Sequence, residues 1–317
     1  MNKFIKIINS HENYMEYNNK KSIQKCKNDK EIRECEIRVN NELIKFNYLH
    51  AFKNEGTHTI EYKFKNLLTK INNLFSECSS LISIDLSNFN AQNVKNMYSM
   101  FYGCSSLKEI DLSNFNTQNV TDMNSMFYGC SSLKDIDLSN FNTQNVKNMG
   151  KMFYGCSSLK DINLSNFNTQ NITDMNSMLY GCLSLENIKL FNSNTQNVKN
   201  VSKMFYGCSS LKEIDLSNFN TQNVTDMNSM FYRCSSLISI DLSNFKTPNV
   251  KNMCKMFSGC SSLESVNIYY FNPENFSRIH NDIKKEISCM FNGCSALKRY
   301  IDIKDYKIRE IIKKMNN

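Results

Sequence analysis

Long apolar runs are missing from this chain of 317 residues. No stretch approaches the roughly 18 consecutive apolar residues of a membrane-spanning helix, so we predict no membrane span. Lys3 and Lys6 interrupt the apolar positions at the N-terminus, and polar residues follow at once. This pattern does not resemble the apolar core of a signal peptide, and we therefore expect a cytoplasmic protein.

Positive charge is scarce in the middle of the chain, although the net charge is +8. Residues 71–269 carry 14 basic and 15 acidic groups, whereas residues 1–70 carry 14 and 9, and residues 270–317 carry 10 and 6. A protein that binds nucleic acid along a repeat array needs basic residues on the array itself. The charge distribution therefore argues against a nucleic-acid partner.

Residue types suited to catalysis or metal binding are also few or poorly placed. The four histidines lie outside the central segment, so no nucleophile and base can be paired there. They are His11, His50, His58 and His280. The closer cysteine pairs, Cys254–Cys260 and Cys289–Cys294, have no histidine nearby to complete a zinc site. We predict no catalytic residues, no metal, no cofactor and no enzymatic activity.

What the sequence does contain is a repeat of 26 residues. One unit, from Leu107 to Cys130, reads LKEIDLSNFNTQNVTDMNSMFYGC. Its last cysteine recurs at constant spacing, at Cys78, Cys104, Cys130, Cys156, Cys182, Cys208, Cys234 and Cys260. Units of this length cannot bury enough surface alone and are typical of arrays in which neighbours stack. We interpret the cysteines as buried packing residues.

Each unit shows two apolar periods. Leu107, Ile110 and Leu112 follow the spacing of a leucine-rich-repeat strand, with alternate residues on the opposite face. From Val120 to Cys130 the apolar residues recur at helical intervals, which predicts a short helix. These residues are Val120, Met123, Met126, Phe127 and Cys130.

The predicted helix has plausible ends. Asn119 recurs in every unit and is a favourable N-cap. Gly129 would end the helix in a left-handed conformation. Arg233 replaces this glycine in one unit, where we expect the least regular helix end. Units also alternate between a Thr-Asp form (Asp122) and a Lys-Asn form (Lys147), which suggests duplication of unit pairs and weak ion pairs between them.

Together these patterns predict an α/β solenoid. It is a leucine-rich-repeat-like array of strand-plus-short-helix units over residues 71–269, with a parallel sheet on one face. Residues 33–70 predict a small β module that caps the first open strand edge. We expect residues 1–32, which are polar, to be loosely ordered. Residues 270–317 should hold an irregular last repeat and a capping helix at Tyr306–Met315, which could alternatively contact a membrane or partner.

The repeat resembles a known family. The stretch from Ser131 to Cys156 follows S-S-L-x-x-I-D-L-S-N-F-x-T-x-N-V-x-x-M-x-x-M-F-x-G-C, the pattern of BspA-like leucine-rich repeats and especially of their mycoplasma-type branch of unknown function. The resemblance covers residues 71–269 and implies a leucine-rich-repeat solenoid. It also implies a surface role for some members, which bind host matrix proteins, and it supplies no catalytic residues. Phe115 stands where a standard repeat has asparagine, so the asparagine ladder is expected at Asn114 and Asn116.

Two surfaces are candidate binding sites. The outward positions of the strands form an acidic ridge, whose members are Asp85, Glu109, Asp111, Asp135, Asp137, Asp161, Glu213, Asp215 and Asp241. Like charges in register repel, so the ridge either binds a basic peptide or protein or is simply solvated. Lys189 and Phe191 interrupt it. A tyrosine ladder is the alternative surface, or else it shields unit junctions. It comprises Tyr102, Tyr128, Tyr154, Tyr180, Tyr206 and Tyr232.

Three functions fit this sequence. The first is a non-enzymatic protein-binding scaffold in the cytoplasm, whose partner is a protein or peptide, basic if it binds the acidic ridge. The second is a cell-surface adhesin-type protein that binds host or matrix proteins. The third is a purely structural or neutrally expanded repeat. The sequence alone indicates neither the partner nor the oligomeric state.

Overall fold

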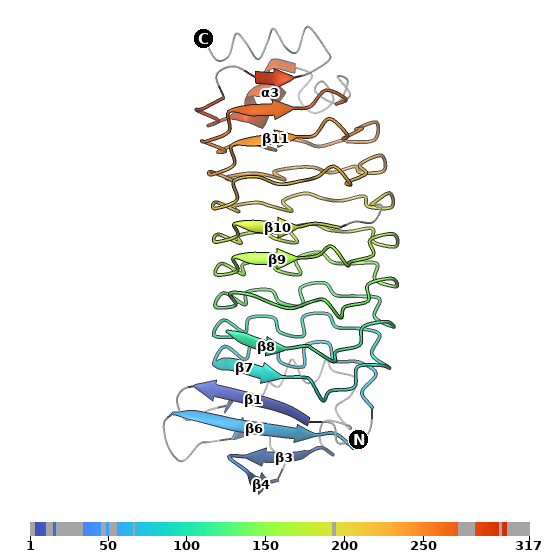
Figure 1. Cartoon of the computed structure of the whole chain (residues 1–317), viewed down its shortest axis with the longest axis vertical. Coiled ribbons are helices and arrows are strands. Elements are labelled where there is room, and N and C mark those ends of the chain that lie inside the picture. Colours follow the sequence, from blue (N-terminus) through green and yellow to red (C-terminus); the bar gives the residue numbers. More distant parts are fainter. Residues whose placement is uncertain are drawn as a thin grey trace.

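The computed structural model describes residues 4–10, 15–16, 34–45, 49–50, 56–65, 67–191, 195–271, 283–297 and 300–302. Within residues 67–271 each 26-residue unit forms one coil, and successive coils stack along the long axis of the molecule (Figure 1). Residues one period apart are therefore spatial neighbours, as the repeat predicts.

Short parallel strands line one side of the stack. They are β7 (Leu81–Asp85), β8 (Glu109–Asp111), β9 (Asp161–Asn163), β10 (Asn187–Lys189), β11 (Ser239–Asp241), β12 (Ser265–Asn267) and β13 (Tyr300–Asp302). They pair as β7 with β8, β9 with β10, and β12 with both β11 and β13. Residues 133–137 and 211–216 form no strand, so the predicted parallel sheet is present as three separate pieces.

An antiparallel module covers the first strand of the array. The sheet order is β4-β3-β6-β1-β7-β8, in which β1 pairs with both β6 and β7. The module strands are β1 (Phe4–Ser10), β3 (Glu36–Val39), β4 (Glu42–Ile44) and β6 (Thr57–Lys63), with β2 (Met15–Glu16) paired to β5 (Leu49–His50). The expectation that residues 1–32 are loosely ordered is therefore wrong for residues 4–10, which form the strand that joins the module to the array.

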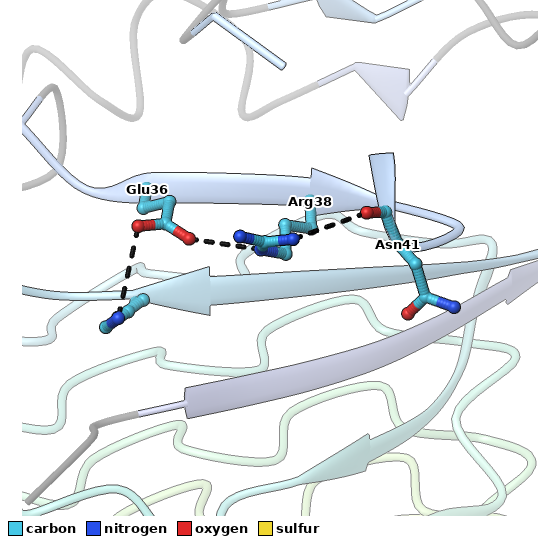
Figure 2. A network of polar contacts seen from close by, with 4 residues as sticks. Glu36, Arg38 and Asn41 are labelled. Carbon is cyan, nitrogen blue, oxygen red and sulfur yellow. Dashed lines mark hydrogen bonds and ion pairs between the residues drawn. The ribbon is translucent and has the colours of Figure 1, made fainter. Parts of the chain in front are cut away.

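The β3–β4 hairpin carries a polar network on its surface (Figure 2). Arg38 Nε donates to Glu36 Oε1 at 3.0 Å, and Lys63 Nζ lies 4.0 Å from Glu36 Oε2. Asn40 and Asn41 form the turn with positive φ angles of 50° and 69°. This conformation matches the tight hairpin that the two asparagines predict.

The predicted helix from Val120 to Cys130 is wrong. An α-helix requires each N–H to bond the carbonyl four residues earlier. Here the N–H groups of alternate residues donate to the next coil, for example Phe127 N–H to the Met152 oxygen at 2.8 Å. The residues between them close turns within their own coil, for example Tyr128 N–H to the Ser125 oxygen at 3.1 Å. The repeat is thus strand and turn, and the described residues contain one helix, α3 (Ile283–Phe291).

The predicted helix ends have other roles. Asn119 Nδ2 donates to the Gln92 oxygen of the preceding coil at 2.8 Å, and the equivalent asparagines do the same along the array. Gly129 does take a left-handed conformation (φ 72°), but inside a turn. Arg233 adopts the same conformation with φ 58° and keeps the inter-coil bond to Ser258, so its turn is regular.

Columns of identical side chains form the core between the faces of each coil. Phe101, Phe127 and Phe153 stack with ring centroids 5.5 Å apart. A second column contains Phe115 and Phe141, with centroids 6.1 Å apart. The expected asparagine ladder is present at the position of Asn114, where the side chain of the equivalent Asn140 donates to the Ser113 carbonyl of the preceding coil. It is not present at Asn116, whose Oδ1 accepts the Gln118 N–H of its own coil at 2.9 Å.

Two features close the far end of the described array. Phe291 of α3 stacks on Phe257 at 5.4 Å, which continues the phenylalanine column. Cys254 and Cys289 form a disulfide with a Cα–Cα distance of 5.8 Å. The predicted capping helix at Tyr306–Met315 lies outside the described residues.

Candidate functional site

The acidic ridge forms two adjacent columns on the strand side of the array. The parallel register pairs Asp85 with Asp111 and Ser83 with Glu109, so equivalent positions of successive coils lie side by side. We name the columns by the residues that belong to the ridge. The inner column comprises Asp85, Asp111, Asp137, Asp215 and Asp241, and the outer column comprises Glu109, Asp135, Asp161 and Glu213. All are exposed except Asp85, which is half-buried.

The inner column has a structural role. Each of its carboxylates accepts the backbone N–H two residues later, as Asp111 Oδ1 does from Ser113 at 2.9 Å. This bond ends the strand with an Asx turn. The Ser139 backbone and hydroxyl lower the pKa of Asp137, and Ser217 acts likewise on the pKa of Asp215. The carboxylates of the inner column therefore stabilise the turns after the strands, and part of their hydrogen-bonding capacity is already occupied.

The outer column is available to solvent. Asp161 accepts a hydrogen bond from Asn187 Nδ2 at 2.6 Å. Glu109, Asp135 and Glu213 accept none in the described part of the chain. None of the nine ridge carboxylates forms an ion pair there, in contrast to Glu36 on the N-terminal module.

A groove with an apolar floor runs through the N-terminal part of the ridge. Its volume is about 460 Å³. It is lined by Ile84, Ile110 and Leu112 and by the acidic side chains of Asp85, Glu109, Asp111 and Asp137. Ile110 remains half-buried because the strand pairing is interrupted after β8. Such a groove can hold a long cationic side chain, whose methylenes contact the isoleucines while its charge meets the carboxylates.

The tyrosine ladder is a continuous stack. Its six rings are parallel or nearly so, with centroids 4.3–4.5 Å apart. Arg233 lies over Tyr232 at 5.3 Å from the ring centroid. Desolvation and the neighbouring phenols raise the pKa of Tyr102, Tyr154 and Tyr206. Because each ring face is covered by the next ring, only ring edges are open to a ligand, and this geometry favours the shielding role over the binding role.

From Cys104 to Cys260 the cysteine column is buried and protonated, whereas Cys78 at its start is half-buried. Each buried thiol donates to a carbonyl of the preceding coil, as Cys130 Sγ does to the Phe101 oxygen at 3.2 Å. Burial raises the pKa of Cys156 and Cys208 to about 12. These thiols are neither nucleophiles nor metal ligands in this state.

The described residues offer little for metal binding or membrane insertion. Among them no group of three or more His, Cys, Asp and Glu side chains could hold a metal ion. Within the same residues no helix has the length and apolar character needed to cross a bilayer.

Three features of the candidate site are not evident from the sequence. These are the apolar floor of the groove, the division of the ridge into a structural and a free column, and a second groove beside Lys189. The division did have a signal, because Asn163 replaces aspartate at the inner position and can accept the same N–H from Ser165 at 3.1 Å. Neither groove had a signal in the sequence, since both depend on where the strand pairing breaks.

Two family models match the chain. The family described as Mycoplasma protein of unknown function, DUF285, matches residues 69–188, 151–268 and 183–302. The BspA type leucine rich repeat region matches residues 12–118. Together they cover most of the chain. No curated protein shows significant similarity to it.

Proposed function

The chain belongs to the BspA-like repeat family, and from this premise we propose that its array is a leucine-rich-repeat solenoid that serves as a non-enzymatic protein-binding scaffold. The acidic ridge is its binding face, and a basic peptide or a basic segment of a protein is its partner. Repeats of the leucine-rich type are compatible with this role.

The free outer column is the observation that carries the proposal. Glu109 and Asp135 lie in equivalent positions of adjacent coils, roughly 5 Å apart by the usual strand spacing. Two such charges repel by about 1 kcal/mol in water and by several times that amount at a low-dielectric surface. Within the described residues no lysine or arginine forms an ion pair with these carboxylates, although exposed lysines precede them in the sequence. A basic partner would offset this repulsion, and it would also cover the exposed edge of Ile110.

A direct test uses charge reversal of the outer column. A triple variant, Glu109→Lys, Asp135→Lys and Glu213→Lys, leaves the Asx turns of the inner column intact. A fluorescent peptide of alternating lysine and valine should bind the wild-type chain, and the triple variant should weaken binding by more than about tenfold. Added salt should weaken wild-type binding in the same direction, because the interaction is between exposed charges.

Matched single variants provide the control. Asp135→Lys and Glu77→Lys change the net charge equally. Glu77, however, lies in a turn away from the ridge, at the position that glycine occupies in later coils, such as Gly103 and Gly129. Only Asp135→Lys should reduce peptide affinity. Equal losses for both variants, or an unaffected triple variant, would rule out the ridge as the binding face.

The cellular location belongs to the same proposal. We infer that the scaffold works in the cytoplasm, which is supported by ten free cysteines among the described residues, whereas the single disulfide, Cys254–Cys289, favours the adhesin alternative. Free thiols in such number are typical of reducing compartments. A membrane-impermeant label applied to intact cells should leave the protein unmodified, whereas labelling would favour the adhesin alternative.

A further inference from the structure

One coil departs from the repeat on the strand side. In most units a serine and an asparagine separate the strand from the core phenylalanine, as in Leu112-Ser113-Asn114-Phe115. In the coil that contains β10 the phenylalanine comes two residues earlier, at Phe191, directly after Leu190. Phe191 still enters the core, where it is 3% exposed and packs on Phe219 with ring centroids 6.5 Å apart and planes tilted by 42°.

This shift uncovers Leu190. Its equivalents in the neighbouring coils, Leu164 and Leu216, are buried with 0% and 2% exposure. Leu190 is instead half-buried. The chain therefore presents an aliphatic side chain to solvent at a position that is part of the core in the coils on either side.

Leu190 lines a groove of about 350 Å³, which we call the notch. Its floor is apolar and its rim carries Lys189 and Asp215. The apolar lining comes from Ile188, Leu190, Phe191, Leu216 and Phe219. The strand pairing ends at β10, since residues 211–216 form no strand, and this break leaves the space open.

Lys189 changes the charge of the ridge at the notch. It occupies the inner-column position that Asp111 and Asp215 occupy elsewhere. Lys189 is exposed and forms no ion pair in the described part of the chain. Because Lys189 and Asp215 lie on the same rim, the notch does not attract a basic residue as the acidic ridge does, whereas a neutral apolar residue matches its floor.

We propose that the notch is a second docking site, which binds a large apolar side chain of the same partner peptide whose basic residues lie on the acidic ridge. This inference rests on the proposed function. The bound segment is thus bipartite: a cluster of basic residues, a short spacer, and one aromatic or long aliphatic residue without a neighbouring positive charge.

The array sets the length of the spacer. The middle of the acidic groove, at β8, and the notch, at β10, are three coils apart along the chain. With coils stacked at about 4.8 Å, this is roughly 14 Å. An extended peptide covers that distance with about four residues.

Two capped peptides test the proposal. Each has three lysines and a four-residue Gly-Ser spacer, followed by Phe in one and Ser in the other, and each is also made in the reverse order. The order of residues that binds the wild-type chain more tightly is then used. In this order the Phe peptide should bind about tenfold more tightly than its Ser counterpart. Leu190→Ser should remove this difference and leave the affinity of the Ser peptide unchanged.

Leu183→Ser is the matched control. Leu183 lies in the same coil, is 50% exposed, and stands where most other coils have serine, as at Ser131. This variant should retain the tenfold preference for Phe. A photoreactive benzophenone in place of the Phe gives a test that needs no variant: on the wild-type chain it should crosslink to residues 188–191 or 215–219.

The outcomes separate the two proposals. Equal binding of the Phe and Ser peptides, or crosslinks outside these residues, would overturn the notch while the ridge proposal stands. Failure of both peptides to bind the wild-type chain would overturn both.

Discussion

Single residues hold the array together by bonding to the backbone of the adjacent coil. Cys130 Sγ, Asn119 Nδ2 and Thr117 Oγ1 each bond to a carbonyl one coil away. Thr117 Oγ1 also accepts the Asn142 N–H at 2.7 Å. Buried polar groups that lack such partners destabilise a fold. Each column of bonded side chains therefore stabilises the array in proportion to the number of coils. These bonds explain why polar residues recur as strictly as apolar ones.

The burial of the cysteines was predictable, but the role of Asn119 was not. The apolar stripe that contains Cys130 indicates burial whether the segment is helix or turn. Asn119 is favourable both at a helix start and in a side-chain ladder between coils. A single sequence cannot distinguish these two cases, because the partner, Gln92, is a neighbour only after stacking.

The raised thiol pKa values predict loss of stability at alkaline pH. In the unfolded chain a cysteine titrates near its ordinary value of 9.0, whereas folded Cys156 and Cys208 titrate near 12. The folded state therefore keeps protons that the unfolded state releases, and stability is lost as the pH rises from about 9 towards 12. The melting temperature should fall over this range, and less steeply in a Cys156→Ala, Cys208→Ala variant. Identical slopes would contradict the thiol contribution.

At the level of elements, the error about the helix has a definite cause. The buried residues between Val120 and Cys130 recur at the spacing of a helix, but the backbone reverses its conformation at Ser125 (φ 57°) and Gly129 (φ 72°). Two consecutive turns then produce nearly the same apolar spacing as three helical turns. Glycine at 129 was a partial signal. Ser125, and lysine at the equivalent position of other units, gave no signal of the turn, since neither residue type favours positive φ.

The 52-residue alternation is explained by packing between coils. Large and small residues alternate along one column: Asn124, Gly150, Asn176, Ser202, Asn228 and Cys254. The asparagines reach over the small residues, as Asn176 Nδ2 does to the Ser202 oxygen at 3.1 Å. The ion pairs expected between alternate units are not found among the described residues, where Asp122 instead accepts the Asn124 N–H at 3.0 Å.

This alternation predicts the effect of a small change at Gly150. A Cβ there would lie 2.9 Å from Asn124 Nδ2 and 3.2 Å from Asn148 Oδ1. Gly150→Ala should therefore destabilise the chain by about 1–2 kcal/mol, although alanine at an unstrained position usually stabilises. In an Asn124→Ala background most of this cost should disappear. Denaturant unfolding of the four proteins measures the coupling, and additive effects would contradict it.

The disulfide predicts a redox-dependent end of the array. Cys254 and Cys289 join the last regular coil to α3, with a sequence separation of 35 residues. Loops of this size are stabilised by about 3–4 kcal/mol when closed. Oxidised protein should melt at a higher temperature than protein treated with dithiothreitol, and Cys254→Ser should abolish the difference. Alkylation of Cys289 in unreduced protein would show that the bond is absent.

The whole molecule is a stack closed at its N-terminal end by an antiparallel module. Stacking followed directly from the constant 26-residue spacing, and the strands within residues 33–70 followed from their sequence pattern. Residues 33–70 do not cover the array themselves, because β1 lies between them and β7. The sequence did not indicate β1, because its strand partners, β6 and β7, are more than 45 residues away. The breaks in the sheet, and hence both grooves, depend on small shifts between coils that no single unit encodes.

Distances between coils test the stacking most directly. Spin labels attached through a noncanonical amino acid avoid the native thiols and can replace exposed Lys95, Lys199 and Lys251, which occupy one column. Lys95 and Lys199 are four coils apart, and Lys95 and Lys251 are six. Double electron–electron resonance should give separations between the two spin labels of roughly 19 Å and 29 Å, an increase of about 5 Å per coil. Separations that do not grow in proportion to the number of coils would contradict the stacked arrangement.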